Sequence, residues 1–201
     1  MINREFFFKQ VRLSLFDGTL KASQVEGLSA LLDEWEANHA AKDDRWLAYA
    51  LATAHHETDR TMKPIHEYGG KEYLRRKYDV TGENPARARK YGNTTAGDGV
   101  RYSGKGFVQL TWKNNYIKAG NEIGFPALVN QPDEAMNPAH AGRIMFLGMM
   151  GGWFTGKRLS DYFNGPTSNW VQARRIINGL DKANLIASYA QAYYAAISYT
   201  V

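Results

Sequence analysis

The sequence contains no cysteine. This absence excludes disulfides, CxxC redox motifs, zinc sites with thiolate ligands and a cysteine nucleophile. Long apolar runs are also absent: the aromatic patch near the N-terminus ends at Lys9, too early for the apolar core of a signal peptide, and no later stretch is long enough for a membrane span. We therefore expect stability to come from packing alone, and a product that begins in the cytoplasm without a signal peptide and without stable membrane insertion.

Repeats, low-complexity tracts and Ser/Gly-rich linkers are missing as well. A chain of 201 residues can bury one well-packed core and is short for two full domains. We therefore expect residues 1–201 to form a single domain, in one or two lobes, with no separate cell-wall-binding domain.

The charge balance is positive. Twenty-five lysines and arginines outnumber 20 aspartates and glutamates, which gives a net charge of +5 and a pI near 9.3. Such a balance favours an anionic partner, and nucleic acid, a membrane surface and an acidic polysaccharide all fit.

Helical patterns cover most of the chain. Apolar spacing, capping residues and breakers predict helices over residues 3–16, from Ser23 through Trp35, from Asp43 or Asp44 to about Thr58, from Pro138 to Met150, from Trp170 to Ile177 and from Asn184 to Ser198. The middle differs: residues 79–106 are rich in Gly, Asn, Thr and Asp and predict an irregular segment, followed by one strand over 107–111. The predicted class is mainly α with a small β element.

Glu57 stands out because it falls on the face of the third helix that carries Trp46 and Ala50. Desolvation there would favour its protonated form, and the carbonyl groups of the helix end would act in the same direction. A carboxyl kept protonated near neutral pH is what a general acid requires. In the alternative, the helix has frayed at this position and the side chain turns to solvent or pairs with Arg60.

The adjacent His55, His56 and Glu57 also raise a metal hypothesis. The zinc-protease pattern HExxH needs a second histidine four residues after the first, and Arg60 occupies that position. The remaining histidines show no ligand spacing. We therefore expect no metal and no cofactor, and the histidine pair then contributes hydrogen bonds.

Three segments carry a family resemblance: Ala54–Thr58 with the sequence AHHET, Arg101–Thr111 with RYSGKGFVQLT followed by Asn114–Tyr116, and Arg175–Gly179 with RIING. In this order they resemble glycoside hydrolase family 19, which contains plant-type chitinases and the lysozyme-like endolysins of bacteriophages. The missing cysteines and the stretch 78–99 look more like the phage and bacterial branch.

The resemblance implies a lysozyme-like, two-lobed helical fold with a small β element and a substrate cleft. It also implies inverting cleavage of a β-1,4 linkage to an N-acetylhexosamine, in which one carboxyl protonates the leaving oxygen and another activates a water, about 6.5–9.5 Å apart. Glu57 matches the general acid of the family.

The general base is Glu67 by resemblance, because it precedes a short glycine-containing stretch as in the phage-like pattern. Asp79, Glu72 and Asp98 are the other candidates, and in the alternative Glu67 is a surface residue or a partner of Lys63 or Arg75. Thr111 matches the hydroxyl that helps hold the water. The residues matching the sugar-binding side of the family pattern are His56, Tyr102, Gln109, Asn115, Tyr116 and Asn178; the two tyrosines would supply platforms for sugar rings, or else belong to the core.

The motif does not separate peptidoglycan from chitin, but the charge favours peptidoglycan. Peptidoglycan carries lactyl and peptide carboxylates that attract a basic enzyme, whereas chitin is neutral. We expect a monomeric peptidoglycan N-acetylmuramidase of endolysin type that acts on glycan strands and reaches them from the host cytoplasm through lesions made by a holin-like protein. Chitin is the alternative substrate.

Two other classes are disfavoured. The cations form short scattered clusters, at 75–77, 87–90 and 174–175, with no recognition helix for nucleic acid. Residues 184–201 are aromatic-rich, but they contain no cation, unlike helices that lie on lipid, so burial against the core is expected.

Overall fold

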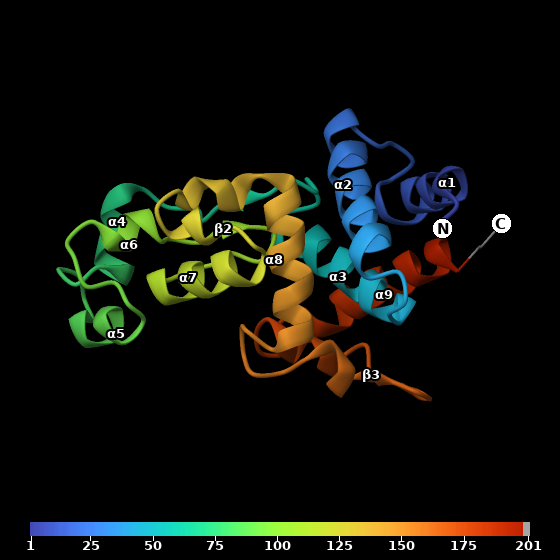
Figure 1. The fold of residues 1–201 in the computed structure, drawn as a ribbon. Helices are drawn as coiled ribbons and strands as arrows, with labels where there is room; N and C mark the ends of the chain where they lie inside the picture. Colours follow the sequence, from blue (N-terminus) through green and yellow to red (C-terminus); the bar gives the residue numbers. More distant parts are fainter. Residues whose placement is uncertain (199–201) are drawn as a thin grey trace. The chain divides into compact units, whose positions relative to one another are not determined.

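The computed structural model describes residues 1–198; residues 199–201, the end of the predicted domain, lie outside the described part. The described chain divides into two compact units. Unit 1 contains residues 1–63 and those from 145 onward, and unit 2 contains residues 64–144. The chain thus leaves unit 1, forms unit 2 and returns, and the return occurs within helix α8 (Pro138–Gly151) (Figure 1).

Unit 1 is built from helices with short β and 3-10 segments. Its elements are α1 (Arg4–Leu15), α2 (Ala22–Asn38), α3 (Asp44–Glu57), the 3-10 helices η3 (Leu159–Asp161) and η4 (Gln172–Ile176), the hairpin strands β3 (Phe163–Asn164) and β4 (Thr167–Ser168), and α9 (Ala183–Ile197). The helix predictions for residues 3–16, from Asp43 or Asp44, and for 184–198 are confirmed. The predicted helix from Trp170 to Ile177 is only the short η4.

Helix α3 forms the centre of unit 1. Its N-terminus is capped by the Asp43 carboxylate, which accepts a hydrogen bond from the Arg45 amide, and all residues from Leu47 to His55 are buried. A helix that is buried all round must be covered by neighbours. Helix α9 packs along it with small residues such as Ala187 and Ala190 buried, which confirms that the C-terminal aromatic helix belongs to the core.

Helix α2 begins earlier than predicted. Ser23 was expected to cap it, but the helix starts at Ala22, and the Gln24 side chain accepts a hydrogen bond of 2.8 Å from the Lys21 amide. Gln24, in the first turn, therefore satisfies the backbone amide of the N-cap residue Lys21.

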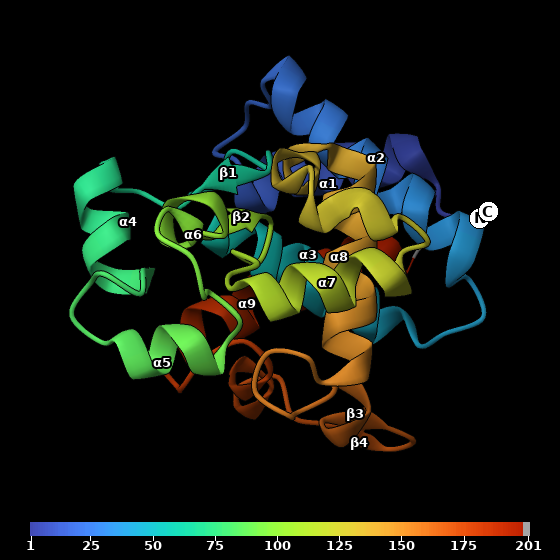
Figure 2. The same cartoon turned by 60° about the vertical axis from the view of Figure 1, so that its left-hand side comes forward.

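Unit 2 contains β1 (Ile65–His66), α4 (Lys71–Tyr78), α5 (Pro85–Lys90), α6 (Asp98–Arg101), β2 (Lys105–Gly106), α7 (Lys113–Glu122) and the 3-10 helices η1 (Pro126–Val129) and η2 (Pro132–Met136), and it ends in the first part of α8. Strands β1 and β2 pair antiparallel, with Ile65 opposite Gly106 and His66 opposite Lys105 (Figure 2). The prediction of a helix from Pro138 is confirmed, and the mainly-α class with a small β element is confirmed with it.

Two predictions for unit 2 are wrong. The strand expected over residues 107–111 is a turn: Gly106 and Gln109 take left-handed φ angles of 91° and 53°, so the chain reverses and Leu110 bonds back to Lys105. The segment 79–106 is not wholly irregular, because it contains α5 and α6. Helix α5 starts at a proline and is capped by Asn84, whose side chain accepts from the Arg87 amide.

Candidate functional site

Glu57 is the last residue of α3, and its carboxyl is paired with Arg174. The Arg174 Nη1 atom lies 2.6 Å from Glu57 Oε1; the glutamate side chain is 21% exposed and the arginine side chain 4%. Arg174 lies in η4, and its Nε donates to the Asp181 carbonyl at 3.2 Å. The carboxyl is thus held in one orientation by a buried guanidinium.

This arrangement corrects the sequence interpretation. Periodicity placed Glu57 on an apolar face, with solvent or Arg60 as the alternatives. Arg60 instead binds the Asp17 carboxylate at 2.6 Å and the Leu15 carbonyl at 3.0 Å. Sequence reasoning missed Arg174 because 117 positions separate it from Glu57, and it was read only as part of a short basic cluster.

The loop after Glu57 has an unusual backbone. Asp59, Arg60 and Met62 all take left-handed φ angles, of 48°, 64° and 55°. Such conformations persist only where the surroundings impose them. Helix α2 does so: Gln24 Nε2 donates to the Arg60 carbonyl at 2.8 Å, and a Cβ on Gly27 would lie 1.8 Å from the Met62 carbonyl oxygen.

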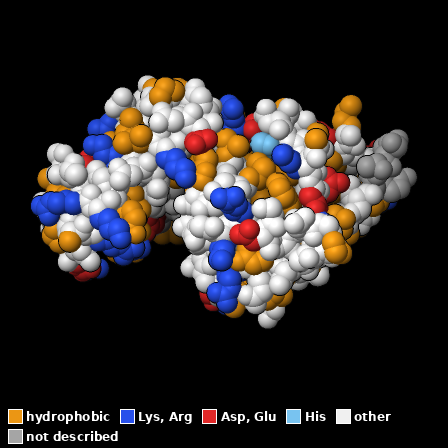
Figure 3. Space-filling model, turned by 60° about the horizontal axis from the view of Figure 1, so that its bottom comes forward, with side chains coloured by type: hydrophobic (Ala, Val, Ile, Leu, Met, Phe, Trp, Pro, Cys, Tyr) orange, Lys and Arg blue, Asp and Glu red, His pale blue; other side chains and the backbone are white. Residues whose placement is uncertain are grey.

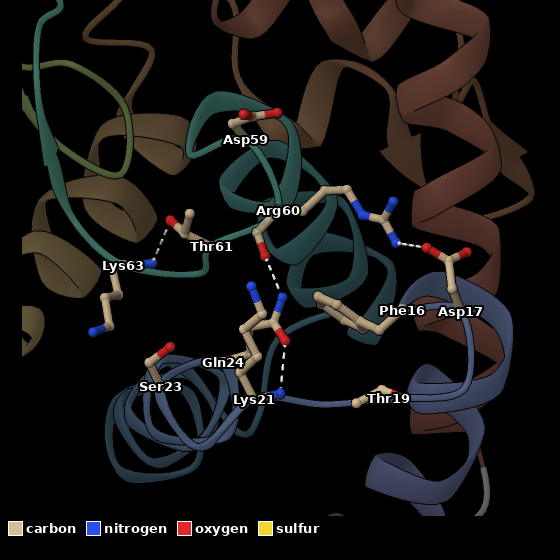
Figure 4. Close-up of a pocket in the computed structure, with 10 residues that line it drawn as sticks. All are labelled: Phe16, Asp17, Thr19, Lys21, Ser23, Gln24, Asp59, Arg60, Thr61 and Lys63. Atoms are coloured by element: carbon tan, nitrogen blue, oxygen red, sulfur yellow. Dashed lines mark hydrogen bonds and ion pairs between the residues drawn. The ribbon is translucent and has the colours of Figure 1, made fainter.

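Figure 4 shows Gln24 joining the start of α2 to the carbonyl of Arg60. A pocket of about 610 Å³ lies beside this contact, and Lys21 and Lys63 are among the residues that line it. The end of α3, and with it Glu57, is therefore fixed by α2 as well as by Arg174.

His55 is a core residue. It is fully buried, its Nδ1 lies 3.0 Å from the Tyr193 hydroxyl, and its ring packs at 4.5 Å from that of Tyr189. Burial lowers the pKa of His55 to about 4, and the charges of Arg60 and His56 act in the same direction. The histidine is thus neutral in the folded protein at physiological pH.

The lowered pKa of His55 makes the stability of the folded protein depend on pH. The unfolded chain binds a proton on His55 at a pKa near 6.5, whereas the folded chain does so only near 4, so the free energy of unfolding falls as the pH drops between these values, by up to about 3 kcal/mol. Denaturant unfolding between pH 7 and 4 measures it. We expect His55→Phe to flatten this slope even if it lowers overall stability, and the matched His140→Phe variant to keep it. Equal slopes in the two variants would contradict the assignment.

Glu67 follows β1 in unit 2 and accepts three hydrogen bonds. Lys77 Nζ and the Tyr78 hydroxyl donate to Oε1 at 3.0 and 2.7 Å, and the Gly104 amide donates to Oε2 at 3.2 Å. The side chain is 16% exposed, and it lines a pocket of about 370 Å³ together with His66 and Lys105. The carboxylate is therefore oriented by α4 and by the segment before β2, and it remains accessible from the pocket.

The two side chains that donate to Glu67 Oε1, those of Lys77 and Tyr78, both have shifted pKa values. Burial raises the pKa of Tyr78 to about 12, and the neighbouring Glu67 acts in the same direction. Burial alone would lower the pKa of Lys77, but hydrogen bonds to Tyr73, Tyr78 and Glu67 raise it overall. Lys77 stays charged and Tyr78 stays protonated across the physiological range, so both remain donors to Glu67.

Three of the predicted site residues of unit 2 are connected by hydrogen bonds, and these bonds lead to the strand before Glu67. Gln109 Nε2 donates to the Ile65 carbonyl at 3.0 Å, two residues before Glu67. The Thr111 hydroxyl donates to the Gln109 carbonyl at 2.8 Å, and Asn115 Nδ2 donates to the Thr111 carbonyl at 2.8 Å. The structure thus connects Gln109, Thr111 and Asn115 to one another and to β1, two residues before Glu67. All four predicted side chains are half-buried, and their roles toward water and sugar stay predictions.

Tyr102 and Tyr116 belong to the core instead. They are 3% and 0% exposed, their rings pack at 5.5 Å, and their hydroxyls donate to the carbonyls of Val129 and Ser103. A ring in this position has no face open to a sugar. The prediction that these tyrosines are platforms for sugar rings is therefore wrong, and the alternative, that they belong to the core, describes them. These tyrosines therefore pack in the core of unit 2.

The other candidates for the general base have different surroundings. The Asp79 carboxylate is buried and accepts from the amides of Gly97 and Gly99; burial alone would raise its pKa, but these hydrogen bonds lower it. The Asp98 carboxylate accepts from two backbone amides, and Glu72 is an exposed partner of Arg75. The first two stabilise loops and the third lies on the surface; Glu67 stays the predicted base.

His56 and Asn178 lie in unit 1. His56 is half-buried next to Glu57 at the end of α3. Asn178 is exposed, and its side-chain oxygen accepts from the Gly179 amide at 2.8 Å. Their predicted contacts with sugar stay predictions.

Gly104 permits the contact with Glu67. A Cβ at this position would lie 2.7 Å from Gln109 Oε1 and 3.1 Å from Glu67 Oε2, so one of the side chains must move. We expect Gly104→Ala to lower glycan hydrolysis by about tenfold to a hundredfold, since small displacements of a reacting group cost this much, with little change in Tm. Gly70→Ala is the matched control, because a Cβ there meets nothing within 4 Å; a Gly104→Ala variant as active as this control would contradict the expectation.

Among the described residues, no cluster of three or more His, Asp or Glu side chains could hold a metal ion. In the same part of the chain, no helix is both long and apolar enough to cross a membrane.

Comparison with known families identifies the family of this chain. The family model described as chitinase class I matches residues 30–160, a span that contains Glu57, Glu67 and Thr111. The chain belongs to glycoside hydrolase family 19. It is therefore a glycoside hydrolase, and its substrate is a glycan.

Solved structures of the family share the fold. Chitinase C from Streptomyces griseus is 18% identical with a TM-score of 0.61, covering 99% of this chain and 77% of that one. A bacterial family 19 chitinase is 18% identical with a TM-score of 0.57, covering 99% and 96%. The class IV chitinase from Zea mays is 17% identical with a TM-score of 0.55, covering 98% and 93%. No curated protein sequence matches this chain.

Proposed function

We propose that this glycosidase hydrolyses the β-1,4 bonds of bacterial peptidoglycan as an inverting N-acetylmuramidase. The observation that carries the proposal is that two carboxyls are each oriented by their own partners. Glu57 forms an ion pair with Arg174, and Glu67 accepts hydrogen bonds from Lys77, Tyr78 and Gly104. Two positioned carboxyls are what inverting hydrolysis of a glycosidic bond requires.

In the proposed reaction, Glu57 donates a proton to the glycosidic oxygen as the C1–O bond breaks. Glu67 removes a proton from a water whose oxygen bonds to C1 from the opposite face, so the product has the inverted anomeric configuration. The Thr111 hydroxyl can orient this water, because its donor capacity is used by the Gln109 carbonyl and its lone pairs can accept. Glu57 takes up a proton from solvent before the next turnover, and its Oε1 atom can keep accepting from Arg174 while Oε2 carries the proton.

The net charge of +5 supports peptidoglycan as the substrate, since that polymer carries carboxylates that attract a basic enzyme. We also propose the biological setting: a monomeric endolysin of a bacteriophage, held in the host cytoplasm and released to the wall with the help of a holin. Chitin is the second candidate, because the similar solved structures are chitinases.

Product analysis tests the proposal. Mass spectrometry of digested peptidoglycan should show new reducing ends on N-acetylmuramic acid, and NMR during the reaction should show the inverted anomer first. Reducing ends on N-acetylglucosamine would make the enzyme a glucosaminidase. Cleavage of chitin oligosaccharides with no cleavage of peptidoglycan would replace the proposed substrate by chitin.

A further inference from the structure

The positive charge of the chain is concentrated in one short segment. Residues 71–90 contain seven lysines and arginines and three acids, which accounts for four of the five net charges. The rest of the chain has eighteen basic and seventeen acidic residues and is nearly neutral. The charge that favours an anionic substrate therefore belongs to helices α4 and α5 of unit 2.

These two helices are held together from inside. Leu74 and Tyr78 of α4, Ala88 of α5 and Trp112 form one buried cluster. With the apolar residues turned inward, all seven cations of the segment are exposed. Figure 3 shows lysine and arginine side chains on the side of the view where Figure 1 draws α4 and α5, and further ones over the middle of the same face.

Three of the four cations of α4 are already paired. Arg75 binds Glu72, Arg76 binds Glu83, and Lys77 binds Glu67.

The cations of α5 are available. Arg87, Arg89 and Lys90, which we call the α5 basic face, have no acidic partner among residues 1–198. Two of them rest against aromatic rings, Arg87 at 5.5 Å from that of Trp112 and Lys90 at 5.7 Å from that of Tyr91. Contact with a ring restricts a long side chain and so lowers the entropy lost when it binds a ligand.

We propose that the α5 basic face binds the carboxylates of the peptide stems of peptidoglycan and holds the enzyme on the wall. This inference rests on the proposed substrate. Stem peptides place carboxylates repeatedly along the polymer, which complements three unpaired cations on one short helix; exposed ion pairs are weak one by one, so several must act together. The same unit carries Glu67, and Lys77 joins α4 directly to it, so binding at this face would keep the general base of unit 2 at the polymer.

Binding can be measured apart from cleavage. In an inactive Glu57→Gln background, the affinity for purified sacculi free of teichoic acid is compared between the triple variant Arg87→Gln, Arg89→Gln, Lys90→Gln and a control triple variant Lys9→Gln, Lys42→Gln, Lys157→Gln. The three control lysines are exposed in unit 1, and both variants lose three charges. We expect the face variant to bind at least tenfold more weakly and the control to change less than twofold. Raising the salt to 0.5 M should remove this difference, because it shortens the screening length to less than about 5 Å.

Further arms identify the ligand. Sacculi stripped of their stem peptides by an amidase should bind the parent protein as weakly as intact sacculi bind the face variant, while binding to neutral chitin beads should not distinguish the variants. The double variant Arg89→Gln, Lys90→Gln, which keeps the contact with Trp112, should show an intermediate loss, and its Tm checks the fold. Equal binding of the face and control variants, no effect of stripping, or tighter salt-sensitive binding of duplex DNA through the same residues would each overturn the inference. Reducing-end release by the wild type is scored separately, so an enzyme that binds stems but does not cleave peptidoglycan refutes the proposed function alone.

Discussion

Replacement of Glu57 by glutamine is expected to lower glycan hydrolysis by about 10²–10⁴-fold, the range that general acid catalysis contributes. The amide has the shape of the acid but cannot donate a proton to a leaving oxygen at this strength. Its carbonyl oxygen can still accept from Arg174 Nη1, which lies 2.6 Å from the carboxylate oxygen. The guanidinium therefore keeps a partner, and the fold should survive.

Initial rates on purified peptidoglycan and on chitin oligosaccharides, together with Tm, measure this effect. The exposed Glu26→Gln variant is the matched control, since it makes the same chemical change on α2. We expect the control to retain full activity and both variants to melt within a few degrees of the wild type. Wild-type rates in Glu57→Gln would remove Glu57 as the general acid.

Replacement of Glu67 by glutamine is expected to cost about 10²–10³-fold in hydrolysis. The carboxylate accepts on both oxygens, from Lys77 and Tyr78 on one and from Gly104 on the other. An amide offers a single acceptor oxygen, so its nitrogen must face a donor on one side. The variant loses the base and misplaces the side chain at once.

Two further variants separate these effects. Tyr78→Phe removes one donor and leaves the carboxylate, so we expect a loss of only a few fold if Glu67 is the base. Glu72→Gln makes the same change as Glu67→Gln on a surface carboxyl six positions before Tyr78 and should retain activity. Full activity of Glu67→Gln with loss in Glu72→Gln would reverse the assignment of the base.

The sequence predicts well where local signals are strong. The ends of α1 and α3 follow from capping by Asn3 and Asp43 and from the turn at Asp17, all of which act within a few residues. Helix α4 has no such signal: its sequence is mostly charged, and only Leu74 and Tyr78 are buried. The turn after β2 reads as a strand because Val108 and Leu110 alternate with polar residues, and nothing local shows that Gln109 takes a left-handed conformation.

The residues of the candidate site also differ in whether a local sequence pattern reveals them. The motifs single out Glu57, Glu67 and the segment Gln109–Thr111 as candidates, because these residues lie in short continuous patterns; their catalytic roles stay predictions. Arg174 has no motif of its own that points to Glu57, since their contact depends on how distant segments of unit 1 pack. Whether an aromatic ring is a platform or core also depends on packing, and the burial of Tyr102 shows that a motif position does not decide it.

Unit 2 is an insertion within unit 1, and this determines the order in which contacts can form during synthesis. The hydrogen bond between His55 and Tyr193 joins residues 138 positions apart. Contacts across such long stretches of chain form late, because the entropy of closing the intervening loop must be overcome first. Helix α3 is synthesised well before α9, the helix that covers it. Unit 2 is synthesised completely before α9 begins. The helix that carries Glu57, but not the unit that contains Glu67, therefore needs the last helix of the chain to complete its packing.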